Sequence, residues 1–381
     1  MNLVGYAFPW DVVGDDGALA RLLEWRPDRV ALAVSYHGAR LPTPLHPTHR
    51  ILEIPHSAFY LPVRDEAWAG RALRPEPATW LDSPPRTLEM ARDLRREGLD
   101  VDAWVVLCHV DPLDARGAPF RVRNAFGDLY SHALCPAWPE VREYAATLVE
   151  EILAAGAFSG LVLEAAGTVG VEHGALHDKV EFANWSDTDL ALLSLCFCDA
   201  CSELLHSRGM NPTELAARVR EGVGRQEIHV DDVVGHDLER LRHHRLDLVS
   251  NLLRTCLEVV SGVDAPCRVS VHASGDPWAT GSFVPLEKGG LVNSLDVVVA
   301  SGWSDAKRTE LIDAARQLRE TGLLGAYLRL DRGWPGGSVA QALRDLRDAG
   351  VGELHLYHSG LWTDAHWRLA HEIAREARSL S

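Results

Sequence analysis

The sequence predicts a (β/α)8 barrel, the TIM-barrel fold, formed by one domain over residues 1–381. Three observations predict it: eight short apolar runs, amphipathic stretches between most of them, and a helical stretch after the last run. Alternating strands and helices are typical of a parallel sheet, and a helix after the eighth strand completes eight units. An open doubly wound sheet is the alternative, but no G-x-G-x-x-G motif follows the first strand.

The strands are predicted from apolar runs bounded by polar turn residues, and the helices from apolar residues that recur at intervals of three and four. The predicted strands are Leu3 to Phe8, Arg29 to His37, Asp102 to Val110, Gly160 to Ala165, Arg268 to Ser274, Leu295 to Ser301, Gly325 to Asp331 and Glu353 to Ser359. The predicted helical stretches include residues 18–25, 86–98, 140–156, 231–260, 310–322, 339–350 and 366–380.

Two connections are long, and both follow strands, which places them on the face where barrel enzymes carry their catalytic groups. The first, residues 38–79, is rich in proline and predicts a lid-like loop with a small hairpin over the barrel mouth. The second, about residues 168–263, contains a polar loop, a run of cysteines and two or three helices. No internal repeat or low-complexity linker divides the chain, so we expect one domain with elaborated loops.

The composition is that of an ordinary soluble globular protein, with 46% apolar and 24% charged residues. A net charge of −16 argues against binding to nucleic acid or to anionic membranes, since both need a basic face. A neutral or cationic small molecule is the expected substrate. The absence of a long apolar run and of a signal-peptide pattern predicts a cytoplasmic location, which seven cysteines, an odd number, also suit.

Cys196, Cys198 and Cys201 form a C-x-C-x2-C run, a spacing that can wrap one tetrahedral metal ion such as zinc. On a helix these positions would point in different directions, which argues against three thiols packed on one core face. The fourth ligand is expected to be Cys135, just before a predicted helix, with His206 as the local alternative. Four thiolates leave no open position for water, so we expect a structural zinc site.

Glu164 ends the fourth predicted strand, where a carboxylate after four apolar residues lies at the rim of a barrel. If it is half buried there, its pKa should rise toward neutrality, which would suit a general acid. A rim glutamate paired with an arginine is the structural alternative.

The order of these features resembles the zinc-containing bacterial beta-galactosidases of the large clan (clan A) of (β/α)8 glycoside hydrolases. The resemblance rests on Cys135 in a C-P-A-W-P segment, Glu164 at a strand end and the C-x-C-x2-C run, and it covers roughly a fifth of the chain. It implies a barrel, a zinc held by these four cysteines, and Glu164 as acid/base.

The sequence departs from this family at two places. Leu163 precedes Glu164 where the family has an asparagine, and Asp331 is the carboxylate near the end of strand 7, where the family has a nucleophilic glutamate. Asp331 is therefore expected to be the nucleophile or base, with Glu172 or Asp305 as alternatives. Galactose as the substrate does not follow from the resemblance.

Polar and aromatic side chains follow several predicted strands, and jointly they indicate a pocket for a polyhydroxylated substrate. The candidate substrate-binding residues are Trp10, His37, His109, Arg123, Asn124, Glu172, His173, His177, His272, Trp303, Asp305, Trp334 and His358. The first hypothesis is a glycoside hydrolase acting on a small carbohydrate or glycoside. The alternatives are a metal-dependent barrel hydrolase or lyase that uses the rim histidines, and a noncatalytic sugar-binding barrel. The sequence leaves open whether the protein forms a homo-oligomer.

Overall fold

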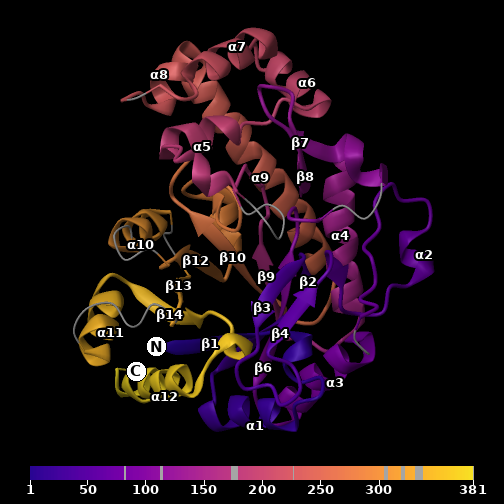
Figure 1. The fold of residues 1–381 in the computed structure, drawn as a ribbon, viewed down its shortest axis with the longest axis vertical. Helices are drawn as coiled ribbons and strands as arrows, with labels where there is room; N and C mark the ends of the chain where they lie inside the picture. Colours follow the sequence, from indigo (N-terminus) through magenta and orange to yellow (C-terminus); the bar gives the residue numbers. More distant parts are fainter. Residues whose placement is uncertain are drawn as a thin grey trace.

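The computed structural model describes residues 1–80, 83–111, 115–172, 179–225, 227–303, 308–318, 322–330 and 338–380. Eight parallel strands close into a barrel, as the sequence predicts (Figure 1). The ring is closed because β1 pairs in parallel with both β2 and β14. The barrel strands are β1 (Asn2–Ala7), β2 (Arg29–Tyr36), β6 (Asp100–Val106), β9 (Gly160–Glu164), β10 (Arg268–Ser274), β12 (Val297–Ser301), β13 (Leu323–Leu328) and β14 (Val351–Leu356).

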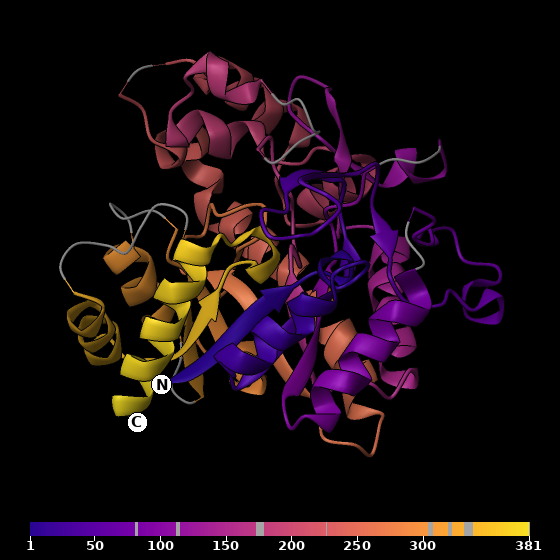
Figure 2. The same cartoon turned by 60° about the horizontal axis from the view of Figure 1, so that its bottom comes forward.

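Helices cover the outside of the barrel. They are α1 (Asp16–Trp25), α3 (Ser83–Arg96), α4 (Pro139–Ala154), α9 (Leu238–Ser261), α10 (Arg308–Gln317), α11 (Val339–Asp348) and α12 (Asp364–Ser379). Both chain ends lie on this outer layer, where the Met1 ammonium donates to the Ala377 carbonyl oxygen at 3.3 Å (Figures 1 and 2). None of the helices that the structure describes is long and apolar enough to cross a membrane.

One unit departs from the regular alternation of strand and helix. The connection from β10 to β12, residues 275–296, contains β11 (Val284–Pro285) and the 3-10 helix η5 (Gly290–Ser294) but no α-helix. Glycines and prolines recur through this segment, and both residue types disfavour the interior of an α-helix. Two further 3-10 helices, η1 (Pro9–Asp11) and η6 (Ser359–Leu361), follow β1 and β14.

Short antiparallel hairpins follow β2 and β6. After β2, β3 (Ala39–Pro42) pairs with β4 (Ile51–Ile54), β5 (Ala58–Phe59) pairs with the end of β2, and α2 (Asp65–Trp68) comes next. After β6, η2 (Ala115–Phe120) leads into the pair β7 (Arg121–Arg123) and β8 (Leu129–Leu134). The sequence does not predict this second hairpin, because a strand as short as β7 gives no readable alternation.

The chain between β9 and α9 forms a helical layer, which lies at the top of Figure 1. Its elements are η3 (Val180–Ala183), α5 (Asp187–Leu193), α6 (Asp199–Ser207), α7 (Pro212–Gly222), α8 (Val230–Val234) and η4 (Gly235–Asp237). Leu192, Leu205, Leu215 and Val219 form an apolar core of its own. Ala125, from the turn between β7 and β8, belongs to the same core, so the hairpin and the helical layer pack as one unit.

The lower half of the barrel interior is charged, although TIM barrels usually fill it with branched apolar side chains. Arg29 donates to both oxygens of Asp102 at 2.7 and 2.8 Å, and Arg268 donates to both oxygens of Glu353 at 2.8 and 2.7 Å. Asp102 and Glu353 are completely buried. Each buried carboxylate is therefore paired, as burial of a charge requires.

Two glycines on the barrel strands make room for these polar side chains. A Cβ atom at Gly160 would approach Asp102 Oδ1 to 2.5 Å, and one at Gly325 would approach His355 Nε2 to 2.9 Å. Both approaches are closer than a real Cβ allows, so any larger residue would displace the polar groups. The polar interior is thus built into the strand sequences.

The ion pair of Glu353 predicts a loss of stability in acid. Desolvation raises the pKa of this carboxyl, but His355 and Arg268 outweigh that effect and lower the pKa to about 2 from 4.5. A lowered carboxyl pKa stabilises the fold above the unfolded-state value, and this stabilisation is lost as the pH falls through the folded-state value. We expect about 3 kcal/mol of unfolding free energy from this group to be lost between pH 4.5 and 2.

Urea unfolding followed as a function of pH measures this loss. Glu353→Gln should flatten the acid limb of the stability curve, whereas Glu97→Gln, in the exposed turn after α3, should keep it. An acid limb of the same slope in all three proteins would show that Glu353 is not the group responsible.

Candidate functional site

Glu164 is the last residue of β9 and lies buried at the carboxyl-terminal mouth of the barrel. Trp104 on β6 donates its indole N–H to Glu164 Oε2 at 2.7 Å. His272 on β10 places Nδ1 3.4 Å from the same oxygen. The two strands that flank β9 therefore hold this carboxylate in place, at the end of the barrel where TIM-barrel enzymes carry their catalytic groups.

The pKa of Glu164 is lower than that of an ordinary glutamate, so the expectation of a raised pKa is wrong. Desolvation by burial raises the pKa, but the neighbouring His272 ring, a hydrogen bond from Ser282 and the charge of His37 together lower it. Glu164 is therefore ionised at neutral pH. A carboxylate can take up a proton, attack an electrophile or stabilise positive charge, but it needs a proton from a neighbour to act as an acid.

Imidazole and aromatic rings surround Glu164. Tyr36 packs against Trp104 with ring centroids 4.8 Å apart, and His37 stacks on Tyr36 at 4.2 Å. His109 stacks on the other side of this group, 4.1 Å from His37 and nearly parallel to it. The predicted residues His37 and His109 are thus brought together beside the carboxylate.

His358 lies in the same group and is unusual in two respects. It is fully buried 4.9 Å from the Trp104 ring, and neither ring nitrogen has a hydrogen-bond partner among the residues that the structure describes. Its backbone has a φ of 47°, which is rare for a residue other than glycine and marks functional sites. Desolvation keeps the pKa of His358 well below its usual value, so the ring is neutral.

Trp303 continues the aromatic group toward solvent. It stacks on Tyr327 with ring centroids 5.8 Å apart, and Tyr327 in turn lies 4.7 Å from His272. The Arg329 guanidinium lies 4.9 Å from the Trp303 ring centre, a cation–π distance. Trp303 is partly exposed, so part of its side chain is accessible to solvent.

A cavity of about 590 Å³ opens between the ends of β10 and β12 and the helical layer. Phe283 lines it and stacks on His272 at 5.0 Å, which connects the cavity to the Glu164 site. Trp278 provides an aromatic wall, and the predicted residue Glu172 and Asp276 are among the carboxylates around it. The size suits a small molecule of several rings at most.

Three predicted substrate-binding residues have structural contacts instead. Asn124 accepts from two backbone amides of the turn between β7 and β8, at 2.9 and 3.0 Å, and Arg123 donates to Gly127 in the same turn. Trp10 is 2% exposed and stacks on Phe8 at 4.1 Å. These contacts give all three side chains a role in holding the loops and the core.

Five predicted site residues lie outside the described residues. They are Asp331, His173, His177, Asp305 and Trp334.

Trp104, Tyr36 and Tyr327 border the site but are not among the site residues that the sequence predicts. Trp104 and Tyr327 sit inside apolar runs, where an aromatic ring reads as a core residue. The two-residue period of a strand could have indicated them. It places Trp104 on the inward side together with Asp102, and Tyr327 on the inward side together with Gly325.

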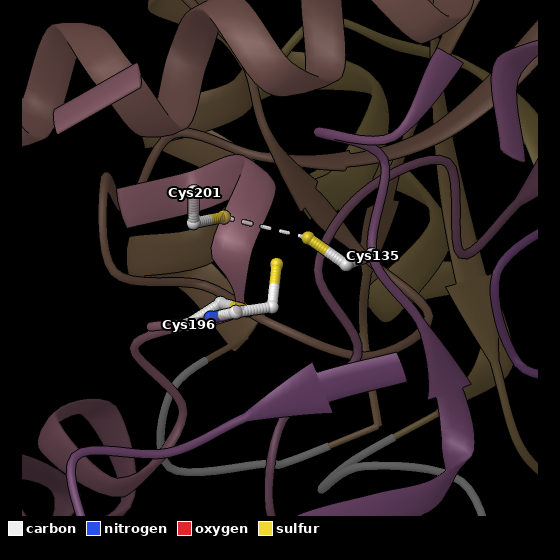
Figure 3. Close-up of side chains that lie close together, drawn as sticks. Cys135, Cys196 and Cys201 are labelled. Carbon is white, nitrogen blue, oxygen red and sulfur yellow. Dashed lines mark hydrogen bonds between the residues drawn. The ribbon is translucent and has the colours of Figure 1, made fainter. Parts of the chain in front are cut away.

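Four cysteines form a second centre away from the barrel mouth. The sulfur atoms of Cys135, Cys196, Cys198 and Cys201 all lie within 4.8 Å of one another. Cys135 Sγ and Cys201 Sγ are 3.4 Å apart, and Figure 3 shows these two residues with Cys196. The group could hold a metal ion, and its fourth member is Cys135 rather than His206, which is exposed on α6. A set of four thiols is the donor set of structural zinc sites.

The local backbone explains how the four cysteines meet. Cys135 directly follows β8, Cys198 is the N-cap of α6, and Cys201 lies in its first turn. The Cys198 amide donates to Cys196 Sγ at 3.5 Å, and the Phe197 amide donates to the Arg123 carbonyl oxygen at 2.7 Å. Hydrogen bonds from Cys135, Cys196 and Cys201 lower the pKa of the Cys198 thiol.

The sequence matches no protein-family model and no curated protein. The structure is similar to the glycoside hydrolase domain of PgaB (BpsB) from Bordetella bronchiseptica, with a TM-score of 0.58 and 15% identity over 98% of both chains. It is also similar to the catalytic domain of a beta-amylase from Paenibacillus polymyxa, with a TM-score of 0.51 and 11% identity over 98% of this chain and 99% of that one. The chain has the TIM-barrel fold of these glycoside hydrolases.

A beta-galactosidase from the psychrophilic Marinomonas ef1 is a further similar structure, with a TM-score of 0.56 and 11% identity. The match covers all of this chain and 60% of the galactosidase chain. At these levels of identity the similarity establishes the barrel fold.

Proposed function

We propose that the protein is a carbohydrate-active enzyme, a glycoside hydrolase or a close relative, acting on a neutral or cationic glycoside. The observation that carries the proposal is Glu164, a buried carboxylate at the barrel mouth among aromatic and imidazole rings. The similar structures support it, since they are a glycoside hydrolase domain, a beta-amylase and a beta-galactosidase.

In this proposal Glu164 is the general acid/base and Asp331 is the second carboxylate, acting as nucleophile or base. In the sequence Asp331 comes three residues after Leu328, the last residue of β13, and the parallel strands β13 and β9 end at the same edge of the barrel. A carboxyl separation of about 5–5.5 Å would give retention of the anomeric configuration, and one of about 6.5–9.5 Å would give inversion.

The rings around Glu164 supply the sugar-binding surface. Trp303 is the stacking platform, because a partly exposed indole can cover the apolar face of a pyranose. His37 and His109 supply hydrogen bonds to hydroxyl groups, His358 packs against Trp104 within the same group of rings, and Glu172 borders the adjoining cavity. His173, His177, Asp305 and Trp334 complete the set from the loops after β9, β12 and β13.

We further propose that the four cysteines bind zinc and that the whole chain is one domain. The zinc would tie the helical insertion, about residues 168–263, to the hairpin after β6, while the insertion at about 38–79 would form a lid. In this arrangement the zinc takes no part in the reaction.

The alternative of a metal-dependent hydrolase finds less support. Among the residues that the structure describes, the cysteines are the group arranged to hold a metal. His37 and His109 stack face to face rather than pointing their nitrogens at a common centre. Measurement of glycoside cleavage distinguishes a hydrolase from a noncatalytic sugar-binding barrel.

A panel of aryl glycosides and oligosaccharides tests the proposal, with new reducing ends as the signal and NMR of the product anomer as the stereochemical readout. We expect cleavage of at least one member, and a loss of about 10²- to 10⁴-fold in kcat for Asp331→Asn. Asp348→Asn, on the exposed side of α11, is the matched control and should leave kcat unchanged. Binding of a sugar without any cleavage would replace the hydrolase by the noncatalytic barrel.

A further inference from the structure

A chain of polar groups runs from Glu164 through the barrel axis toward the opposite end. His272 Nδ1 approaches Glu164 without a hydrogen bond in this structure, and hydrogen bonds join the groups below it. Beyond the 3.4 Å contact between Glu164 and His272 Nδ1, His272 Nε2 lies 2.8 Å from the Tyr6 hydroxyl. The same hydroxyl lies 2.9 Å from His355 Nδ1, and His355 Nε2 lies 2.9 Å from Glu353 Oε1. His272, Tyr6 and His355 are completely buried, so solvent does not interrupt the chain.

The direction of the chain is fixed at its lower end. Glu353 is an ionised acceptor whose two oxygens are held by Arg268, so His355 Nε2 must carry a hydrogen and donate it. Desolvation lowers the pKa of His355, which keeps this ring neutral and leaves its Nδ1 as an acceptor. The Tyr6 hydroxyl must therefore donate to His355.

The hydrogen positions on His272 follow from those on Tyr6. Burial raises the pKa of Tyr6 well above its usual value, so its single hydroxyl hydrogen stays in place and is used toward His355. The Tyr6 oxygen can then only accept from His272, which requires a hydrogen on Nε2. His272 Nδ1 thus faces Glu164 either as a bare lone pair or with a second hydrogen.

A bare lone pair 3.4 Å from a carboxylate oxygen is repulsive, so one extra proton belongs between these two atoms. Trp104 donates to the same oxygen of Glu164, which favours the carboxylate form of this residue. The other charged or titratable groups near the chain are Asp102 and Arg268 below, His37 above and Tyr327 at the side, whose ring centre lies 4.7 Å from those of Tyr6 and His272.

We propose that Tyr6 and Glu353 are positioning residues that orient this chain, so that the Glu164–His272 pair holds the proton delivered to the leaving group. The proton moves from His272 Nδ1 to Glu164 Oε2 and from there to the glycosidic oxygen, leaving a carboxylate and a neutral imidazole. The proposal rests on the proposed hydrolase function. It explains how a carboxylate that is ionised in the resting protein acts as an acid.

Nitrogen-15 NMR of histidine-labelled protein tests the chain without any substrate. At neutral pH we expect His355 as the neutral Nε2–H tautomer and His272 with both nitrogens protonated, the signals being assigned from His272→Gln and His355→Gln. Tyr6→Phe removes the acceptor for His272 Nε2, so His272 should become neutral with its hydrogen on Nδ1. Glu353→Gln, whose amide can also donate to His355, should produce the same change at His272.

Tyr60→Phe is the matched control, because Tyr60 is also fully buried but its hydroxyl has no hydrogen-bond partner in the described part of the chain. A neutral His272 in the parent protein, or an unchanged protonated His272 in Tyr6→Phe, would overturn the proposal. With a cleaved glycoside, the alkaline limb of kcat/KM should move to lower pH in Tyr6→Phe and stay in place in Tyr60→Phe. If no glycoside is cleaved while the tautomers are as expected, the hydrolase function fails and the chain stands.

Discussion

Replacing Glu164 by glutamine is expected to lower kcat by about 10²- to 10⁴-fold, the usual contribution of a general acid/base, while leaving glycoside binding nearly unchanged. The amide has almost the same shape, and its carbonyl oxygen can still accept from Trp104, so the packing at the end of β9 is retained. It can neither carry the negative charge nor pass on a proton. The loss therefore falls on the chemical step.

The measurement compares kcat and KM of Glu164→Gln with those of Glu97→Gln, an identical change in the exposed turn after α3. Substrates with a good leaving group, such as nitrophenyl glycosides, should lose less activity than alkyl glycosides, because their departure needs little protonation. Equal losses for both kinds of substrate would remove Glu164 from the acid role. Unchanged turnover would remove it from the reaction.

The barrel could be predicted because its strands are buried on both faces and therefore stand out as apolar runs. Glu164 could be predicted for the same reason, since a carboxylate at the end of such a run lies at the rim. The cysteine spacing predicted the metal site, and the partner Cys135 could be proposed because it begins a C-P-A-W-P segment before a helix. Apart from the partner Cys135, which lies far from the cysteine run, these features depend on residues close together in the sequence.

The charge state of Glu164 could not be predicted, because it depends on residues from separate strands. His272 is more than a hundred positions away along the chain, yet its ring lowers the pKa of Glu164 against the effect of burial. Tyr6 and His355 lie at opposite ends of the sequence and meet only when β1 pairs with β14. A polar residue inside an apolar run indicates a buried polar contact. Which residue makes that contact is decided only when the barrel closes.

Replacing Cys198 by serine is expected to release the metal and to destabilise the helical layer before it affects catalysis. The parent protein should carry about one zinc per chain, and the variant close to none, as measured by metal analysis after dialysis. Structural zinc sites contribute about 10–16 kcal/mol of apparent binding energy in small peptides, so the cost should be a large fall in melting temperature. Cys267→Ser is the control, because Cys267 is partly exposed and lies outside the group of four.

The site of damage in Cys198→Ser separates a structural zinc from a catalytic one. The cysteine group joins α6 to the end of β8, whereas Glu164 is held by Trp104 and His272 on the barrel strands. Hydrogen exchange should therefore increase first in α5 to α8 and in the hairpin of β7 and β8, with the barrel strands still protected. Activity should fall only in proportion to the loss of folded protein. A variant that stays folded and zinc-replete but inactive would contradict a structural role, because it would place the thiolates in the reaction itself.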